Sequence, residues 1–181
     1  MSEAVGHLLT FTTYGTHLHG HENGSVNRIH RNWGAPMLEA SPTLRNRARC
    51  LMRESRFVLD EVDRNAVLDS VRNASTARRW HLYCVHVRTN HVHLVIRPNI
   101  AIDRALGYLK ARASFALKPF HPERERFWTK HGSARYLWNV EDVTAAMDYV
   151  VNRQGIPMSL FVRSPVAALL APSHTIVQSE P

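Results

Sequence analysis

Two extended apolar runs, residues 80–87 and 91–96, are separated only by Arg88-Thr89-Asn90. A connection this short lets the two runs pair with each other, so the sequence predicts an antiparallel β-hairpin. Helical periodicity of the apolar residues precedes the hairpin, after Asp60, and follows it over residues 102–117. This order predicts an α+β fold in which helices pack against an antiparallel sheet.

The chain outside the hairpin supplies the remaining elements of this fold. The pattern predicts strands over residues 7–13 and 135–138, a helix that begins at Ser41, and a helix over residues 141–153. We expect residues 1–160 to form one domain. Residues 161–181 are rich in Pro, Ala and Ser, and we expect them to form a loosely ordered tail.

The helix after Ser41 has an unusual distribution of charge. Ser41 is its expected N-cap and Pro42 its first helical residue. Its expected buried stripe consists of Leu44, Ala48, Leu51 and Met52. Its other face carries Arg45, Arg49, Arg53 and Arg56. Such a face is either a solvated surface or a contact for phosphate groups, and the pattern leaves both open.

Composition narrows the class of function. The chain has 181 residues, and 23 Lys and Arg against 15 Asp and Glu give a formal charge of +8, which favours a polyanionic partner. No apolar run is long enough to span a membrane. With two cysteines and no CxxC, neither a disulfide scaffold nor a zinc site of that type is expected. The expectation is a soluble intracellular domain, because Met1-Ser-Glu-Ala does not resemble a signal peptide.

Alternating histidines form the first candidate for chemistry. His91 and His93 are two residues apart on a predicted strand, so their side chains share one face, with Cα atoms about 6–7 Å apart. Two imidazoles at this spacing can bind one metal ion. The alternative is two ordinary, half-exposed histidines. A second alternating set, at 17, 19 and 21, lies among glycines and is a weaker metal candidate.

A tyrosine on the last predicted helix is the second candidate. Its apolar stripe consists of Val143, Ala146, Met147, Val150 and Val151. Tyr149 lies roughly 130° from the centre of that stripe, so the core does not need its ring. Tyr108 lies off the stripe of its own helix in the same way, so periodicity alone does not single out Tyr149.

These pieces resemble a known family when they are taken together. The segments concerned are Phe11-Thr12-Thr13-Tyr14-Gly15-Thr16, Asn90-His91-Val92-His93, Trp128-Thr129-Lys130-His131-Gly132-Ser133-Ala134-Arg135-Tyr136-Leu137-Trp138, and the helix with Tyr149, Gln154 and Gly155. They resemble the small bacterial transposases (insertion-sequence 200-like) that use one catalytic tyrosine and an HUH motif, meaning His-hydrophobic-His. Within this family they are most similar to the branch associated with repetitive extragenic palindromes.

The resemblance implies a fold and a mechanism. The fold would be similar to ferredoxin-like and RNA-recognition-motif domains, with the HUH strand central. His91 and His93 would hold a divalent metal, Mg²⁺ or Mn²⁺, against a scissile phosphate. Tyr149 would attack phosphorus and form a 5′-phosphotyrosine with release of a 3′-OH. Residues 1–160 would then be the transposase (HUH endonuclease) domain.

In the family, a polar residue one helical turn after the tyrosine usually completes the metal site. Gln154 is expected in this role, although on an ideal helix it lies roughly 140° from Tyr149. Asn152, about 60° away, is the alternative. The expected contacts to DNA are Arg104, Lys110, Arg112, Lys130 and Arg135. Trp128, Trp138 or His131 could stack on bases, but core packing is the stronger expectation for both tryptophans.

The expected function is therefore that of a DNA transposase which cuts and rejoins single-stranded DNA with hairpins. Two alternatives remain: a domesticated protein that binds hairpin repeats without cutting, and a metal-dependent phosphodiesterase that uses water. The expected location is the bacterial cytoplasm, in association with the nucleoid and without contact to a membrane. A homodimer is possible, and no sequence feature decides for or against it.

Overall fold

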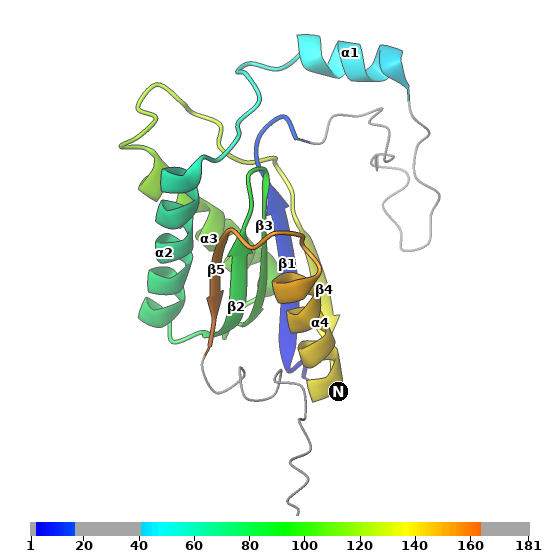
Figure 1. The fold of residues 1–181 in the computed structure, drawn as a ribbon, viewed down its shortest axis with the longest axis vertical. Coiled ribbons are helices and arrows are strands. Elements are labelled where there is room, and N and C mark those ends of the chain that lie inside the picture. The colour runs from blue at the N-terminus through cyan, green and yellow to red at the C-terminus, as the bar shows by residue number, and fades with distance from the viewer. Residues whose placement is uncertain (1–2, 17–40, 164–181) are drawn as a thin grey trace, which may run out of the picture.

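The computed structural model describes residues 3–16 and 41–163. Its elements follow one another along the chain as shown in Figure 1. They are β1 (Gly6–Thr12), α1 (Pro42–Cys50), α2 (Glu61–Ala77), β2 (His81–Val87), β3 (His91–Arg97), α3 (Ile102–Leu117), β4 (Ser133–Leu137), α4 (Val140–Asn152) and β5 (Ser159–Val162). No helix of the described residues is long and apolar enough to cross a membrane.

The five strands form one antiparallel sheet in the order β4-β1-β3-β2-β5, so that β3 is central. Helices α2 and α3 cover one face of the sheet and α4 covers the other (Figure 1). The succession β1-α2-β2-β3-α3-β4 is the ferredoxin-like arrangement. The predicted α+β class, the hairpin and the ferredoxin-like sheet are therefore confirmed.

The two faces of the sheet have separate hydrophobic cores. The larger core lies under α2 and α3 and includes Leu94 of β3. The smaller core lies under α4 and includes Val95 of β3 together with Met147 and Val150 of the helix. Successive residues of a strand point to opposite faces. Since Val95 lies under α4, His93 shares that face.

The helix α1 begins as the sequence predicts, but it does not pack as predicted. The Ser41 side chain accepts a hydrogen bond from the backbone N–H of Leu44, which confirms the N-cap. The helix has no buried residue, and Leu44 and Leu51 are 45% and 74% exposed. The predicted buried stripe is therefore wrong, because the helix projects beyond the sheet instead of lying on it (Figure 1).

The strand β5 was not predicted. Its four residues pair antiparallel with β2, with Val162 opposite Cys84 and Ser159 opposite Val87. The sheet thus continues through Val162, two residues into the segment expected to be a tail. Residues 164–181, and the alternating histidines at 17, 19 and 21, lie outside the described residues.

Candidate active site

The centre of the sheet presents two histidines to the face that α4 covers. His91 and His93 are on β3, and their ring centroids are 4.6 Å apart. In the register of the sheet, His93 lies opposite Thr10 of β1 on one side and His86 of β2 on the other. A rigid central strand thus holds the two imidazoles side by side, as a shared ligand would require.

The contacts of His93 keep its ring neutral and oriented. Its Nδ1 is 2.7 Å from Oγ1 of Thr10, and the Gln154 side chain also hydrogen-bonds the ring. The pKa of His93 is lowered to about 4, chiefly by burial and in smaller part by the nearby His91, His86 and Arg88. At neutral pH the imidazole is therefore uncharged, which is the form that donates a lone pair to a metal.

The neighbouring ring is oriented by the residue before it. Nδ1 of His91 is 2.7 Å from Oδ1 of Asn90, and a carboxamide oxygen can only accept, so the proton lies on Nδ1. This tautomer puts the lone pair on Nε2. A metal-binding histidine is commonly oriented by a second hydrogen bond of this kind.

Tyr149 reaches the histidines from α4. The helix packs through Val143, Ala146, Met147 and Val150, as predicted. Tyr149 is off this stripe and 40% exposed, and its ring centroid is 5.5 Å from that of His93. The tyrosine is thus held beside the imidazole pair while solvent, or a substrate, can still reach it.

The structure distinguishes Tyr149 from the other off-stripe tyrosine, which periodicity alone could not do. Tyr108 of α3 packs against the larger core, 5.6 Å from the ring of Trp80, and Arg78 lies over its face. It is therefore a packing residue on the opposite side of the sheet from His93.

The end of α4 brings Gln154, and not Asn152, to the histidine side. The helix ends at Asn152, and Gly155 adopts a φ of 75°, so ideal helical geometry does not apply to Gln154. Nε2 of Gln154 donates to the carbonyl of Tyr149 at 3.1 Å, and the Gln154 side chain also contacts His93. The Asn152 amide instead donates to Asp148 at 2.9 Å and lowers the pKa of that carboxyl.

Exchanging these two amides for alanine should separate their roles. Gln154→Ala removes the group that contacts His93, and we expect it to lower the rate of metal-dependent DNA cleavage by roughly 10- to 100-fold. Asn152→Ala is the matched control and should change that rate by less than about twofold, because its partner is on the exposed helix surface. Single-turnover cleavage of a labelled oligonucleotide measures both. If Asn152→Ala lowered the cleavage rate more than Gln154→Ala, the third ligand would be Asn152 and not Gln154.

A third histidine connects the end of α4 to the sheet through two hydrogen bonds. His86 of β2 is fully buried. Its Nδ1 donates to the carbonyl of Val150 at 2.9 Å, and its Nε2 accepts from the backbone N–H of Met158 at 3.1 Å. Burial lowers the pKa of His86, in agreement with this neutral form. The segment with Tyr149 and Gln154 is thus held on both sides by one ring.

Loss of this ring should destabilise the domain. His86→Leu leaves a buried carbonyl and a buried N–H without partners, and we expect the free energy of unfolding to fall by about 2–5 kcal/mol. Urea denaturation followed by circular dichroism measures the change. His86→Gln can replace at least one of the two hydrogen bonds and should be less destabilising. Equal stability of the leucine variant and the wild type would contradict this role.

The donor set suits a divalent metal. Two imidazoles and one carboxamide oxygen combine nitrogen and oxygen ligands, a set that favours a transition metal such as Mn²⁺ over Mg²⁺, which prefers oxygen. The described residues contain no group of three His, Cys, Asp or Glu side chains that could hold a metal. Within this part of the chain, Gln154 is the side chain that could add a third ligand to His91 and His93.

The five basic residues expected to contact DNA lie in different places. Arg104 and Arg112 are exposed on α3, on the face opposite the histidines. Nζ of Lys110 donates to the carbonyls of Thr129, Lys130 and His131 at 2.5, 3.2 and 3.4 Å. A phosphate contact by Lys110 would require it to leave these carbonyls.

The other two of these five basic residues, Arg135 and Lys130, lie nearer to the histidines. Arg135 is opposite Leu8 in the sheet and therefore points to the face that carries His93. Lys130 is exposed and follows Thr129, whose hydroxyl is 3.0 Å from that of Thr12. Thr12 in turn lies opposite His91.

The two tryptophans have different environments. Trp128 packs against the larger core, with its ring centroid 4.9 Å from that of Phe11, as expected. Trp138 is 54% exposed and stacks on Tyr136 at 5.7 Å. The expectation that Trp138 packs in the core is wrong, because β4 is an edge strand and Trp138 follows its last residue.

Sequence reasoning missed three residues that orient the site: Thr10, Asn90 and His86. Asn90 precedes the first histidine directly, so its place in the motif was the only local signal. The partners of Thr10 and His86 depend on strand register and on the course of the chain after α4. Neither follows from spacing along the sequence.

Comparisons with known proteins give one family and one structure. The profile of a family described as "Transposase IS200 like" matches residues 47–152, a range that includes His91, His93 and Tyr149. The fold is similar to a structure described as "Structure of the REP associates tyrosine transposase bound to a REP hairpin". The two chains are 11% identical with a TM-score of 0.46, over 84% of this chain and 67% of that chain. No curated protein matches.

Proposed function

The chain belongs to the IS200-like transposase family, and from this premise we propose that it cuts and rejoins single-stranded DNA through a covalent bond to Tyr149. The observation that carries the proposal is the meeting of three groups on one face of the sheet. They are the paired imidazoles of His91 and His93 and the accessible hydroxyl-bearing ring of Tyr149. Gln154 joins them through its contact with His93.

The reaction exchanges one phosphate ester for another. The Tyr149 oxygen forms a bond to phosphorus while the bond from phosphorus to the 3′-oxygen breaks. The tyrosine proton is balanced by the proton that the released 3′-oxygen gains. The products are a 5′-phosphotyrosine and a 3′-OH, so the energy of the ester bond is retained. Attack by the 3′-OH of another strand reverses the step and joins that strand without ATP.

The chain's own residues supply the positions that this reaction needs. His91 and His93 are the ligands for a divalent ion, with Gln154 as the third. When bound, the ion neutralises charge that develops on the phosphate oxygens. Thr10 and Asn90 orient the two rings, and β3 keeps the rings in place. Anchoring of α4 by His86 keeps the nucleophile close to them.

The proposed substrate is single-stranded DNA that carries hairpins, in accordance with the branch of the family that the motifs resemble. Arg135 and Lys130 are the basic residues best placed to contact it, because they lie on or beside the histidine face. Arg104, Lys110 and Arg112 remain in the proposal as contacts to the hairpin backbone. A homodimer is compatible with this function.

The decisive experiment traps the intermediate. Purified protein is incubated with labelled single-stranded hairpin oligonucleotides and Mn²⁺, Mg²⁺ or EDTA, and the products are separated under denaturing conditions. A metal-dependent covalent protein–DNA band is the expected result. Cleavage without that band would favour a phosphodiesterase that uses water. Tight binding without cleavage under either metal would favour a non-catalytic repeat binder.

A further inference from the structure

Four arginines of the segment between β1 and α2 gather in one place, and the proposed reaction does not use them. Arg45, Arg49, Arg53 and Arg56 line a single hollow of about 530 Å³. We call this feature the arginine hollow. Its other lining residues are Gly15, Thr16, Met52, Glu54 and Ser55. Since α1 has no buried residue, packing on the core does not account for this helix or for its charge.

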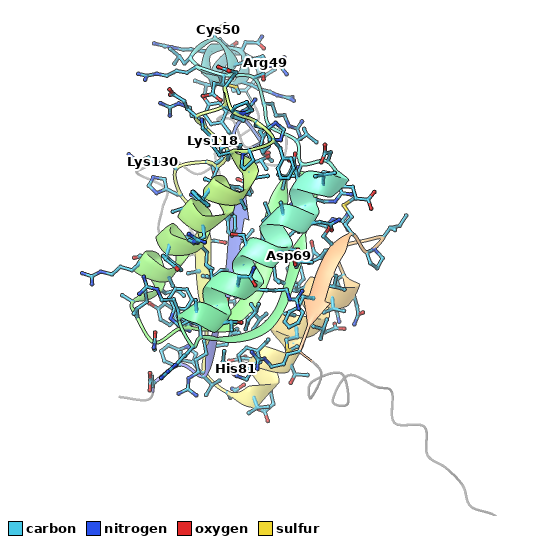
Figure 2. The ribbon with its side chains drawn as sticks, turned by 90° about the vertical axis from the view of Figure 1, so that its left-hand side faces the viewer. Arg49, Cys50, Asp69, His81, Lys118 and Lys130 are labelled. Atoms are coloured by element: carbon cyan, nitrogen blue, oxygen red, sulfur yellow. The ribbon has the colours of Figure 1, made fainter. Side chains whose placement is uncertain are left out.

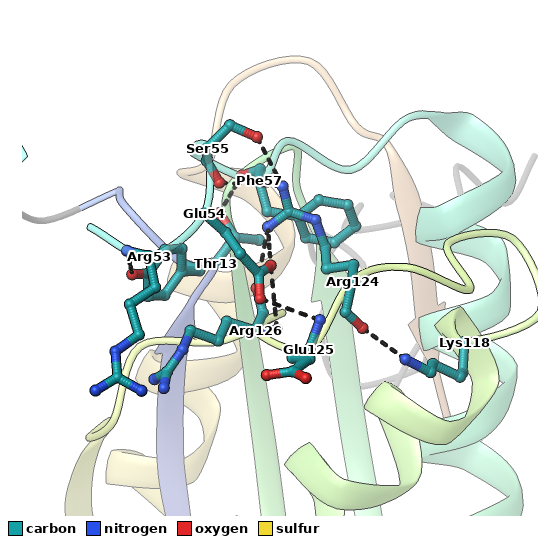
Figure 3. A network of polar contacts seen from close by, with 10 residues as sticks. Thr13, Arg53, Glu54, Ser55, Phe57, Lys118, Arg124, Glu125 and Arg126 are labelled. Atoms are coloured by element: carbon teal, nitrogen blue, oxygen red, sulfur yellow. Dashed lines mark hydrogen bonds and ion pairs between the residues drawn. The ribbon is translucent and has the colours of Figure 1, made fainter.

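The one acid that lines the hollow is occupied elsewhere. Glu54 lies 3.3 Å from Nη1 of Arg124 and accepts hydrogen bonds from the backbone N–H groups of Glu125 and Arg126 (Figure 3). Among the described residues, no ion pair involves Arg49, Arg53 or Arg56. Counted over the residues that the structure describes, the arginine hollow therefore has a net positive charge.

The hollow lies at the same end of the sheet as the candidate active site. The chain that leaves it is fixed there by hydrogen bonds from the N–H of Phe57 to the carbonyl of Tyr14 and from the N–H of Leu59 to that of Thr89. Thr89 belongs to the hairpin turn that leads into His91. Figure 1 shows α1 beyond this end of the sheet, and Figure 2 shows Arg49 at the opposite end from His81.

We propose that the arginine hollow binds backbone phosphates of the DNA strand that occupies the active site. This inference rests on the proposed function, and it assigns a second contact to the same substrate. Guanidinium groups match phosphate oxygens in a bidentate geometry, and the contact does not depend on base sequence. A strand that extends past His91 toward α1 would reach the arginine hollow.

The test removes two charges from the hollow and compares them with two charges removed elsewhere. Arg49→Gln combined with Arg53→Gln alters two exposed side chains and keeps the backbone hydrogen bond from Arg53 to the Tyr14 hydroxyl. The control combines Arg97→Gln with Arg79→Asn, near the other end of the sheet. Asparagine tolerates the φ of 54° at position 79, and Arg97 makes only a 3.8 Å ion pair with the exposed Glu3.

The probe is a fluorescent 30-nucleotide oligothymidylate in EDTA, titrated at several salt concentrations. It needs neither a target sequence nor cleavage, so its result is independent of whether Tyr149 reacts. We expect the hollow variant to bind roughly tenfold more weakly than wild type near 0.1 M salt. The slope of log K against log salt should fall by about 1.4, for two lost phosphate contacts on a single strand. The control should change affinity by less than about twofold.

Three outcomes would overturn the inference. One is a hollow variant whose affinity and salt slope match those of the control. Another is a wild-type protein that does not bind the oligonucleotide even at low salt. The third is a hollow variant that loses affinity for polyglutamate but keeps the wild-type affinity for the oligonucleotide, which would assign the hollow to an acidic protein. Failure of adduct formation, with the binding result as expected, would contradict the proposed function alone.

Discussion

Replacing Tyr149 with phenylalanine is expected to abolish the covalent protein–DNA adduct and leave the fold intact. The substitution removes one oxygen from a ring that is 40% exposed and lies outside the apolar stripe of α4. The ring itself would stay 5.5 Å from that of His93. Without the nucleophile, strand cleavage should fall by at least about a thousandfold, the scale on which loss of a nucleophile lowers turnover. A denaturing gel of labelled DNA measures the adduct.

The chain contains a matched control for this substitution. Tyr108→Phe makes the same change on a helix that covers the opposite face of the sheet, where the ring packs on Trp80. This variant should form the adduct at the wild-type rate. Persistent cleavage by Tyr149→Phe would show that another nucleophile reacts. Persistent cleavage without an adduct would identify water as that nucleophile.

Replacing His93 with alanine should have the second largest effect, because it removes a metal ligand and two hydrogen bonds together. Thr10 and Gln154 would lose the ring that they orient. We expect the affinity for Mn²⁺ to fall by more than about a hundredfold, and metal-dependent cleavage to disappear. Isothermal titration calorimetry in the absence of DNA measures metal binding directly, so the result does not depend on activity.

His81→Ala is the control for a missing imidazole. His81 is exposed at the start of β2, at the end of the sheet away from α1 (Figure 2). Its loss should leave Mn²⁺ affinity unchanged. A His93→Gln variant separates a ligand effect from a packing defect, because it keeps a polar side chain at the same place. Undiminished Mn²⁺ binding by His93→Ala would refute the assignment of the metal site.

Much of the fold could be predicted because its signals are local. The short turn after Val87 specifies a hairpin whatever surrounds it. The stripe of α3, from Ile102 to Ala113, is buried as predicted because five apolar residues at helical spacing leave only one face for the core. Such patterns identify elements and their inner faces.

Burial of α1 could not be predicted in the same way. Leu44 and Leu51 have the spacing of a buried stripe, but spacing does not reveal whether a partner surface exists. The sheet is already covered by α2 and α3 on one face and by α4 on the other. The strand β5 was missed for a related reason: it is four residues long, and its place depends on the open edge of β2.

The sequence predicted single residues of the candidate site, but it did not predict all the contacts between them. The alternation of His91 and His93 implied a shared face, and the helical angle put Tyr149 outside the core. The position of Gln154 could not be obtained from an angle, because the helix ends before it and the chain turns at Gly155. Its contact with His93 arises from tertiary structure.

The two ends of the segment between Tyr14 and Phe57 meet, because the N–H of Phe57 donates to the carbonyl of Tyr14 at 2.9 Å. The hydroxyl of Thr13 closes the same junction by donating to the carbonyl of Phe57 at 2.6 Å. Because the two ends already touch, an insertion or deletion within this segment need not move β1 or α2, and doubling its length costs only about 0.6 kcal/mol. The length of this segment can therefore change in evolution while the strands and helices that carry His91, His93 and Tyr149 keep their positions.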